Sequence, residues 1–201
     1  MKRIAQKDYQ EAAEILKNGG IVAFPTETVF GLGVIFDNQE SYNRLIQVKE
    51  RPPEKPFTLM CGSKEEIDNY AFVNEKARAL IRAFMPGQFT LILPAKSHLP
   101  WWCVSKEGFV GIRVPDYPLI QKLIKQVGKP LLVPSANKSG EKPAVNDEEV
   151  INCFNEEIDG VIEGSSVSNI PSTIVIIEKD IQVIREGLIS KDQIINVLEA
   201  K

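Results

Sequence analysis

Three cations lie close together in the sequence VKERPPEKPF, at Lys49, Arg51 and Lys55. Prolines are interspersed among them, and proline lowers the entropy cost of holding charges in place. Arg51 precedes a proline and is biased toward extended backbone, in which residues two apart point the same way. If Lys49 shares that geometry, the cations can converge on a polyphosphate, because Arg grips two oxygens and Lys adds a compact charge. The alternative is a solvated loop neutralised by Glu50 and Glu54.

A second polar group follows the apolar residues of LLVPSANKSGEKP, residues 131–143. Ser135 and Asn137 are two residues apart at the end of an expected strand, so their side chains can face the same side. Loops beyond the carboxyl ends of strands commonly line the ligand crevice of α/β sheets. Hydroxyl and amide groups there can bind phosphate, ribose or metal-bound water, although a plain polar turn is the alternative.

Threonine hydroxyls stand at the end of another expected strand, in FPTETVFGLG, residues 24–33. Thr26 and Thr28 flank Glu27 and could contact a small polar substrate; a capped turn is the alternative. Gly31 and Gly33 allow another backbone to approach closely. The segment lacks the Gly-Lys-Ser/Thr of a Walker A loop and does not match the dinucleotide fingerprint.

Two arginines lie in apolar, strand-like segments, Arg113 in GIRVP and Arg185 in VIREG. The second follows Ser172 and Thr173 of IPSTIVII. A buried arginine needs an anionic partner, because an unpaired charge away from water is costly. That partner is either a structural carboxylate, the more common case, or the carboxylate of a substrate.

Composition excludes several classes of site. The 201 residues suit one large domain or two small ones, and 43% hydrophobic residues suffice for a sizeable core. The net charge of −3 gives no general attraction to nucleic acid, so an RNA contact would need a local basic patch. Cys61, Cys103 and Cys153 form no CxxC pair, and the single histidine, His98, argues against a Ser-His-Asp triad. Without a signal-peptide region or a long apolar run, we expect a cytoplasmic location.

The elements that would position these residues alternate irregularly between helix and strand. Asp8 is a candidate N-cap, and Ser190 to Gln193 resembles a capping box. We expect helices over about 8–19, 38–48, 74–85, 118–127, 147–154 and 190–201, and strands over 21–24, 57–60, 89–93, 110–114, 131–133, 161–162, 173–177 and 182–184. This order predicts an α/β domain with a mixed sheet rather than a regular doubly wound one.

Taken together and in this order, the motifs resemble the YrdC-like family of threonylcarbamoyl-AMP synthases. They are PTETVFGLG, KERP, MPGQFTLIL, GIRVP, PSANKSG, PSTIVII and IREG, and they span nearly the whole chain. The resemblance implies a single domain over 1–201, with a core of about 8–188 and a C-terminal helix of about 190–201. Its fold would be a twisted mixed sheet with helices around a large concave, basic cavity.

The resemblance also implies a reaction. L-threonine, bicarbonate and ATP would give threonylcarbamoyl-AMP and pyrophosphate, the first step toward threonylcarbamoyladenosine in tRNA. Mg²⁺ would be carried by ATP, with no separate metal site on the protein. The expected partners are the tRNA-modification proteins that use the adenylate, with tRNA or double-stranded RNA as further candidates and no membrane.

The family's KxR…SxN signature maps onto Lys49, Arg51, Ser135 and Asn137, and Lys49 and Arg51 are the expected catalytic pair. The resemblance implies that ATP is bound by Lys49, Arg51, Lys55, Ser135, Asn137 and Arg185. It implies that threonine is bound by Thr26, Arg113, Val133 and Ser172, with Arg113 on the carboxylate.

The sequence departs from the family pattern at Met60, where many members have a histidine near the threonine site. FTLMCGSKEEIDNYAFV is similar to the YciO branch, although all four signature residues are present. Three alternatives to the synthase stay open. One is a YciO-like protein of the same fold that binds nucleotide or RNA, with a different substrate. The others are a related carbamoyl-adenylating enzyme for another amine and a maturation-type carbamoyltransferase subdomain, which the length of the chain disfavours.

Overall fold

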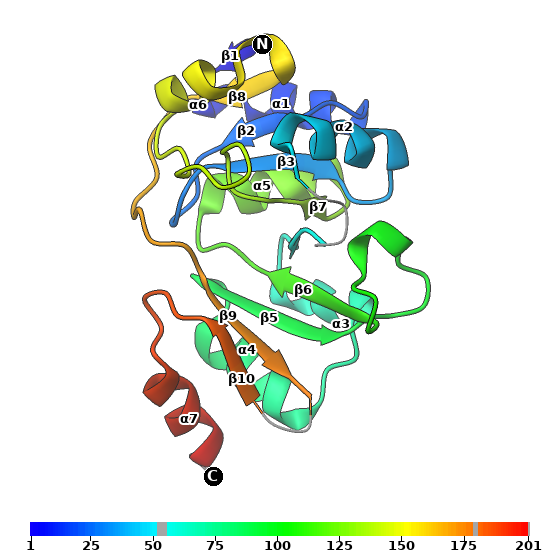
Figure 1. Ribbon diagram of the computed structural model, residues 1–201, viewed down its shortest axis with the longest axis vertical. Coiled ribbons are helices and arrows are strands. Elements are labelled where there is room, and N and C mark those ends of the chain that lie inside the picture. Colours follow the sequence, from blue (N-terminus) through cyan, green and yellow to red (C-terminus); the bar gives the residue numbers. More distant parts are fainter. Residues whose placement is uncertain (52–55, 179–180, 201) are drawn as a thin grey trace.

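The computed structural model of the chain describes residues 1–51, 56–178 and 181–200. Its ten described strands form one twisted sheet, in the order β1-β8-β2-β3-β7-β4-β6-β5-β9-β10 (Figure 1). Neighbouring strands are parallel in the pairs β1/β8, β2/β8, β4/β6 and β5/β9, and the other described pairs are antiparallel. The mixed α/β sheet predicted from the sequence is confirmed.

The strands are β1 (Lys2–Ile4), β2 (Val22–Phe24), β3 (Gly31–Ile35), β4 (Leu59–Met60), β5 (Phe89–Pro94), β6 (Phe109–Arg113), β7 (Leu131–Leu132), β8 (Gly160–Ile162), β9 (Thr173–Ile177) and β10 (Ile181–Arg185). The α-helices are α1 (Tyr9–Lys17), α2 (Gln39–Lys49), α3 (Ile67–Tyr70), α4 (Glu75–Phe84), α5 (Pro118–Val127), α6 (Asp147–Phe154) and α7 (Lys191–Glu199). Short 3₁₀ turns occur at Gln6–Asp8, Lys64–Glu66, Trp101–Cys103 and Asn155–Glu157.

Local signals in the sequence explain where most helices begin and end. The Asn38 side chain accepts the N–H of Ser41 at the start of α2. Gly128 ends α5 in the left-handed conformation, with φ 81°, where a side chain would be strained. The predicted capping box of Ser190 and Gln193 is confirmed at the start of α7. Asp8 does precede α1, but its carboxylate accepts no capping hydrogen bond from the described helix.

Three elements have no counterpart in the sequence prediction: β1, β3 and α3. β1 and α3 are short, three and four residues long. β3 contains Gly31 and Gly33, and glycine is depleted in strands, so GLGVI does not resemble one. The structure gives the reason for these glycines. A β-carbon at Gly31 would lie 2.5 Å from Cγ1 of Val133, and one at Gly33 would lie 2.5 Å from Cε1 of Phe24.

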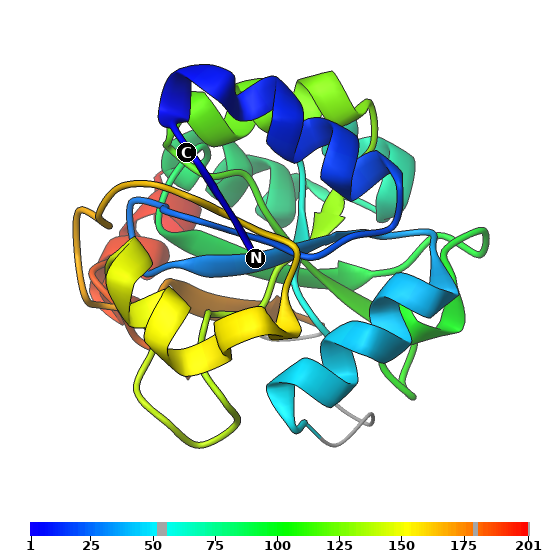
Figure 2. The same ribbon diagram turned by 90° about the horizontal axis from the view of Figure 1, so that it is seen from above.

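Helices cover both faces of the β1-side of the sheet. Figure 2 shows α1 and α5 on one face, and α2 and α6 on the other. One buried cluster accordingly joins α1 and α5 through residues such as Leu16 and Leu123. The other contains Leu45 of α2 and Phe154 of α6, and continues under β5 and β6. These two cores fix the strands whose ends carry the predicted site residues.

Within the described ranges, no helix is both long and apolar enough to cross a membrane.

Candidate functional site

Residues far apart in the sequence line a cavity of about 260 Å³, which we call the polar cavity. It lies where the turn after β2, the end of β6, the segment after β7 and the start of β9 meet. Its polar side chains are Thr26, Thr28, Arg51, Thr58, Thr90, Arg113, Ser135, Ser172 and Arg185. Of the predicted site residues, seven line it: Thr26, Arg51, Arg113, Val133, Ser135, Ser172 and Arg185. Lys49 and Asn137 do not line it, and Lys55 lies outside the described residues.

Lys49 is packed against the segment after β7, with 2% of its surface exposed. Its Nζ donates to the backbone oxygens of Ser135, at 2.5 Å, and Asn137, at 2.7 Å. A third bond, of 3.2 Å, reaches Oδ1 of Asn137. These acceptors match the three N–H donors of an ammonium group. The Lys49 carbonyl also accepts the N–H of Ser139 at 2.8 Å. Lys49 therefore ties residues 135–139 to the end of α2.

The expectation that Lys49 and Arg51 share an extended stretch is wrong. α2 continues through Lys49, and Glu50 then takes the left-handed conformation with φ 52° and ψ 42°. The N–H groups of Glu50 and Arg51 bond back to the carbonyls of Gln47 and Ile46. Proline restricts only the residue directly before it, so the bias that we applied to Arg51 does not extend to Lys49.

The two cations also differ in their surroundings. Burial, and secondarily the charge of Arg51, lowers the pKa of Lys49 to about 8. Arg51 lines the polar cavity with its guanidinium 5.0 Å from the centre of the Phe57 ring. Burial lowers its pKa as well, and its Nε has no hydrogen-bond partner among the described residues. Arg51 is thus placed to donate to an anion in the cavity.

The segment after β7 is held by its own side chains as well as by Lys49. Ser135 Oγ donates to Oδ1 of Asn137 at 2.6 Å. The Asn137 amide nitrogen donates to the carbonyls of Lys138 and Glu141, at 2.7 and 3.1 Å. Asn137 therefore shapes the loop, while Ser135 presents its hydroxyl to the cavity.

The hydroxyls after β2 form a directed chain. Thr26 Oγ1 donates to the Val29 carbonyl at 2.7 Å and lies 2.8 Å from Thr28 Oγ1. A hydroxyl has one proton to donate, so Thr28 must be the donor between the two threonines. Thr28 Oγ1 also accepts from Nη1 of Arg113 at 3.0 Å. The turn after β2 is thereby linked to the end of β6.

Arg113 is buried, with 7% of its surface exposed, and forms an ion pair with Glu27. Nη2 donates to Glu27 Oε1 at 2.7 Å, and Nε donates to the Gly87 carbonyl at 3.3 Å. With the bond to Thr28, three of the five guanidinium N–H donors are accounted for. A structural carboxylate therefore balances this arginine, as the sequence left open, and the side chain still lines the cavity.

Arg185 and Ser172 close the opposite wall. Arg185 Nε donates to the Ser172 carbonyl at 2.9 Å, and its Nη2 lies 3.2 Å from Ser172 Oγ. Thr90 Oγ1 lies 2.9 Å from that same hydroxyl. Burial, followed by the charge of Arg113, lowers the pKa of Arg185. The contribution from Arg113 indicates that the two guanidinium groups are close enough for their charges to interact.

Two contributors were not identified from the sequence: Glu27 as the partner of Arg113, and Thr90. The sequence indicated that a buried Arg113 would need an anionic partner. No local signal identified that partner as Glu27, because it lies 86 positions away in the chain. Thr90 lies in an apolar strand, and nothing in its neighbours marks it. With them, the cavity combines three arginines and several hydroxyls, while none of the described lining residues is acidic. This composition favours a ligand with more than one anionic group.

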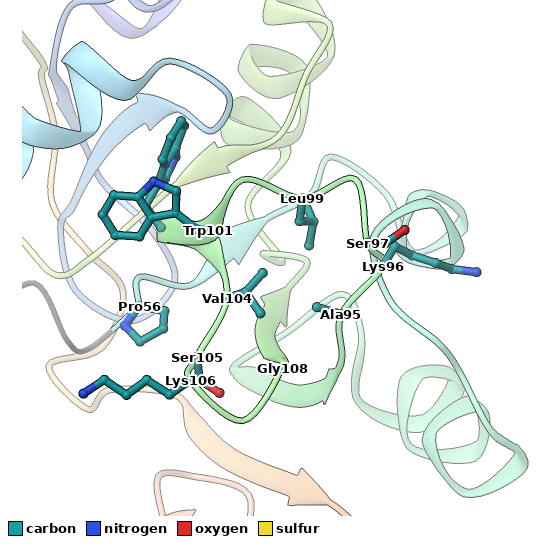
Figure 3. Close-up of a pocket in the computed structure, with 11 residues that line it drawn as sticks. Pro56, Ala95, Lys96, Ser97, Leu99, Trp101, Val104, Ser105, Lys106 and Gly108 are labelled. Atoms are coloured by element: carbon teal, nitrogen blue, oxygen red, sulfur yellow. The ribbon is translucent and has the colours of Figure 1, made fainter.

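Two other cavities adjoin this region. The larger, of about 690 Å³, is lined by Leu99, Val104 and both tryptophans of the Trp101–Cys103 turn. In Figure 3 its lysines, Lys96 and Lys106, extend outward away from the apolar wall. It therefore lacks the inward charges that a polyanion needs. A groove of about 420 Å³ shares Phe57, Thr58 and Thr90 with the polar cavity and gives an elongated ligand further room.

Across the described residues, no group of three or more His, Cys, Asp or Glu could hold a metal ion. Met60 lines the polar cavity beside Arg113, its partner in the β4/β6 register. An apolar thioether thus stands where the resemblance implied a histidine.

Comparison with known proteins is consistent with this architecture. A family model described as "Sua5_yciO_yrdC: Telomere recombination" matches residues 14–187. The threonylcarbamoyl-AMP synthase of Vibrio campbellii is 33% identical over 185 residues, which are 90% of this chain and all of the relative.

Two solved structures are also similar. P. abyssi Sua5 complexed with L-threonine has a TM-score of 0.92 at 28% identity over 98% of this chain; the chain spans 60% of the length of that structure. E. coli YciO has a TM-score of 0.85 at 28% identity, covering 93% of this chain and 95% of the other. The family resemblance predicted from the motifs is confirmed: this chain belongs to the Sua5/YciO/YrdC family.

Proposed function

We propose that this protein is a threonylcarbamoyl-AMP synthase. It combines L-threonine, bicarbonate and ATP into threonylcarbamoyl-AMP, pyrophosphate and water. The observation that carries the proposal is the convergence of Arg51, Arg113 and Arg185 with hydroxyl groups on one cavity. The names of its relatives and the threonine complex of a similar structure support the choice of substrates.

The threonine end of the site is assigned to the wall formed by β6 and the turn after β2. Arg113 retains two N–H donors that no described residue accepts, one on each terminal nitrogen, and the two oxygens of a carboxylate can accept them. Ser172 offers a hydroxyl to the polar groups of the amino acid, Thr26 shapes the same wall through its bonds to Val29 and Thr28, and Val133 offers an apolar surface to the methyl group. The wall therefore carries a separate partner for each part of threonine.

The ATP end is assigned to Arg51, Arg185 and the segment after β7. Arg51 and Arg185 neutralise phosphate oxygens, and the Ser135 hydroxyl bonds to the nucleotide or to the water shell of its magnesium. Lys49 and Asn137 serve the same end by holding that segment in place. Direct contact of Lys49, Lys55 or Asn137 with the triphosphate stays a prediction.

Mg²⁺ would enter with ATP. It prefers oxygen ligands and retains several waters, and none of the described lining residues is a carboxylate. Phosphate oxygens would therefore be its main ligands, with the cavity hydroxyls reaching its water shell. It would neutralise phosphate charge during the reaction.

The protein's task is to bring two anions together. The threonine amine takes up carbon dioxide, formed by dehydration of bicarbonate, and becomes a carbamate. A carbamate oxygen then bonds to the α-phosphorus of ATP while the bond to pyrophosphate breaks. Both partners are negative, so fixed arginines that neutralise and align them lower the barrier. No step needs a covalent bond to the protein.

Pyrophosphate release should require ATP, threonine and bicarbonate together. Omitting each component in turn tests this, and Arg51→Ala should reduce kcat roughly 10²- to 10³-fold. Arg78→Ala is a suitable control, because Arg78 pairs with Asp68 on the surface, away from the cavity. Release that does not depend on threonine would refute the proposal.

Met60 favours one second candidate, the same adenylation of a different amine. The same assay with other amino acids distinguishes the two substrates. Binding of RNA and the partner proteins that use the adenylate stay predictions from the resemblance. A cytoplasmic location stays a prediction from the sequence.

A further inference from the structure

Glu27 is held behind the polar cavity rather than in it. Glu27 is 5% exposed and does not line the cavity, whereas its neighbours Thr26 and Thr28 do. Its Oε1 accepts from Arg113 at 2.7 Å and from the backbone N–H of Asp116 at 3.1 Å. Among the described hydrogen bonds of the Glu27 side chain, only the one to Arg113 leads to a group that lines the cavity.

The acceptors around Arg113 determine which of its donors face the cavity. Thr28, Glu27 and Gly87 each take one N–H, from Nη1, Nη2 and Nε respectively. Of these acceptors, Glu27 carries the charge and makes the shortest bond. An arginine side chain has many rotamers. Loss of the Glu27 carboxylate would therefore free the Arg113 guanidinium to turn away from its present orientation.

Glu27 also adjusts the charge of the site. Arg113 and Arg185 carry like charges on one cavity, and the charge of Arg113 adds to burial in lowering the pKa of Arg185. The carboxylate of Glu27 offsets one of these two charges within a buried region, where an uncompensated charge is costly. The buried Oε2 has no hydrogen-bond partner among the described residues, so Arg113 is the main compensation for this carboxylate in turn.

We propose that Glu27 is a positioning residue for threonine binding: it fixes the Arg113 guanidinium so that its two remaining N–H donors meet the substrate carboxylate. This inference rests on the proposed function. It differs from a purely structural role because it predicts a change in the KM for threonine and not in the KM for ATP.

The test is Glu27→Gln, which retains the side-chain shape and removes the charge. The KM for threonine should increase roughly 10- to 100-fold, the cost of a hydrogen bond to a charged group. The KM for ATP and kcat should change by less than about threefold, since Arg51 and Arg185 are not held by Glu27. Equal increases in both KM values, or none, would overturn the inference.

Asp147→Asn is the matched control. Asp147 is also buried, at 7% exposure, and accepts from an arginine, Arg3, and from the backbone N–H of Gly164, but it lies on α6 away from the cavity. It should reduce stability without changing the KM for threonine. If Glu27→Gln does not fold, Glu27→Asp keeps the charge with a shorter side chain and should give a smaller increase in that KM.

A double-mutant cycle separates action through Arg113 from independent action. In an Arg113→Gln background, Glu27→Gln should raise the KM for threonine by less than about twofold more, because the group it positions is already gone. Fully additive effects would show that Glu27 acts by another route.

One measurement does not depend on the reaction. Exchange of the Arg113 Nε–H with water, followed by ¹⁵N NMR, should become several-fold faster in Glu27→Gln, and Arg113→Lys identifies the signal. If the wild type shows no threonine-dependent turnover, the proposed function fails, and unchanged exchange would independently show that Glu27 does not position Arg113.

Discussion

Lys49 allows the attachment between α2 and the segment after β7 to be tested by titration. The lysine is buried, and its pKa is lowered from 10.5 to about 8. Burial, and secondarily the charge of Arg51, disfavours the charged form, whereas three hydrogen bonds to Ser135 and Asn137 favour it. The lowered pKa means that burial prevails. The perturbation is a change of pH, with Lys49→Met as the reference protein.

Whether stability rises or falls with pH depends on which state, native or unfolded, binds more protons. Between about pH 8 and 10.5 the unfolded chain keeps the Lys49 proton, whereas the native protein releases it. The unfolded state then binds more protons, so stability increases with pH in this window. A pKa difference of this size corresponds to roughly 3 kcal/mol in all, of which about 2 kcal/mol is gained between about pH 7 and about pH 9.5.

Urea unfolding at several pH values measures this gain as the difference between wild type and Lys49→Met. Taking the difference is necessary because burial raises the pKa values of Cys61 and Cys103, which makes stability fall with pH in both proteins. The free energy of unfolding of the wild type should increase by about 2 kcal/mol relative to the variant over that range. A constant or declining difference would show that the three hydrogen bonds outweigh burial, and would refute the reasoning.

Three further predictions concern packing, the site and the thiols. Gly31→Ala should lower the free energy of unfolding by roughly 1–3 kcal/mol in urea, because its β-carbon would lie 2.5 Å from a side chain after β7; an unchanged midpoint would show that the segment can shift. Ser172→Ala removes the partner of two side-chain bonds and should raise the KM for threonine roughly tenfold in the pyrophosphate assay; an unchanged value would remove Ser172 from the site. Burial raises the pKa of Cys103 to about 12 and that of Cys61 further, so a thiol reagent at neutral pH should label Cys153 first. Labelling of all three cysteines at one rate would contradict this burial.

Most elements could be predicted because their signals are local. The expected ranges of α6 and β9 are the observed ones, and α5 has both its initial proline and its final glycine. β3 was not predicted because its signals are not local. Its glycines are required by contacts with Val133, just after β7, and with Phe24 of β2. A strand-propensity pattern contains no information about such contacts.

The site could be predicted only as a set of residue types. Motif order correctly indicated that Arg51, Ser135 and Arg185 would share one cavity. The direction of each side chain depended on backbone turns that the motifs do not show, such as the left-handed Glu50 that separates Lys49 from Arg51. The partner of Arg113 was unpredictable for a related reason: any of 27 acidic residues could have balanced it, and only the fold selects Glu27.

The different positions of the arginines and of Lys49 can be explained by their pKa values. Among the described residues, the three cations that face the polar cavity are arginines, which keep their charge at any pH that the protein tolerates, even where burial lowers their pKa. Lys49, whose pKa of about 8 lies within reach of ordinary conditions, instead bonds to the backbone behind them. Loss of its proton would leave two donors for three acceptors and loosen the segment that carries Ser135. The charge that these arginines present to the cavity is therefore insensitive to pH, whereas the shape of the segment that carries Ser135, the proposed nucleotide end, is not. Alkaline conditions should weaken ATP binding before threonine binding, because no lysine contacts the Arg113 wall among the described residues.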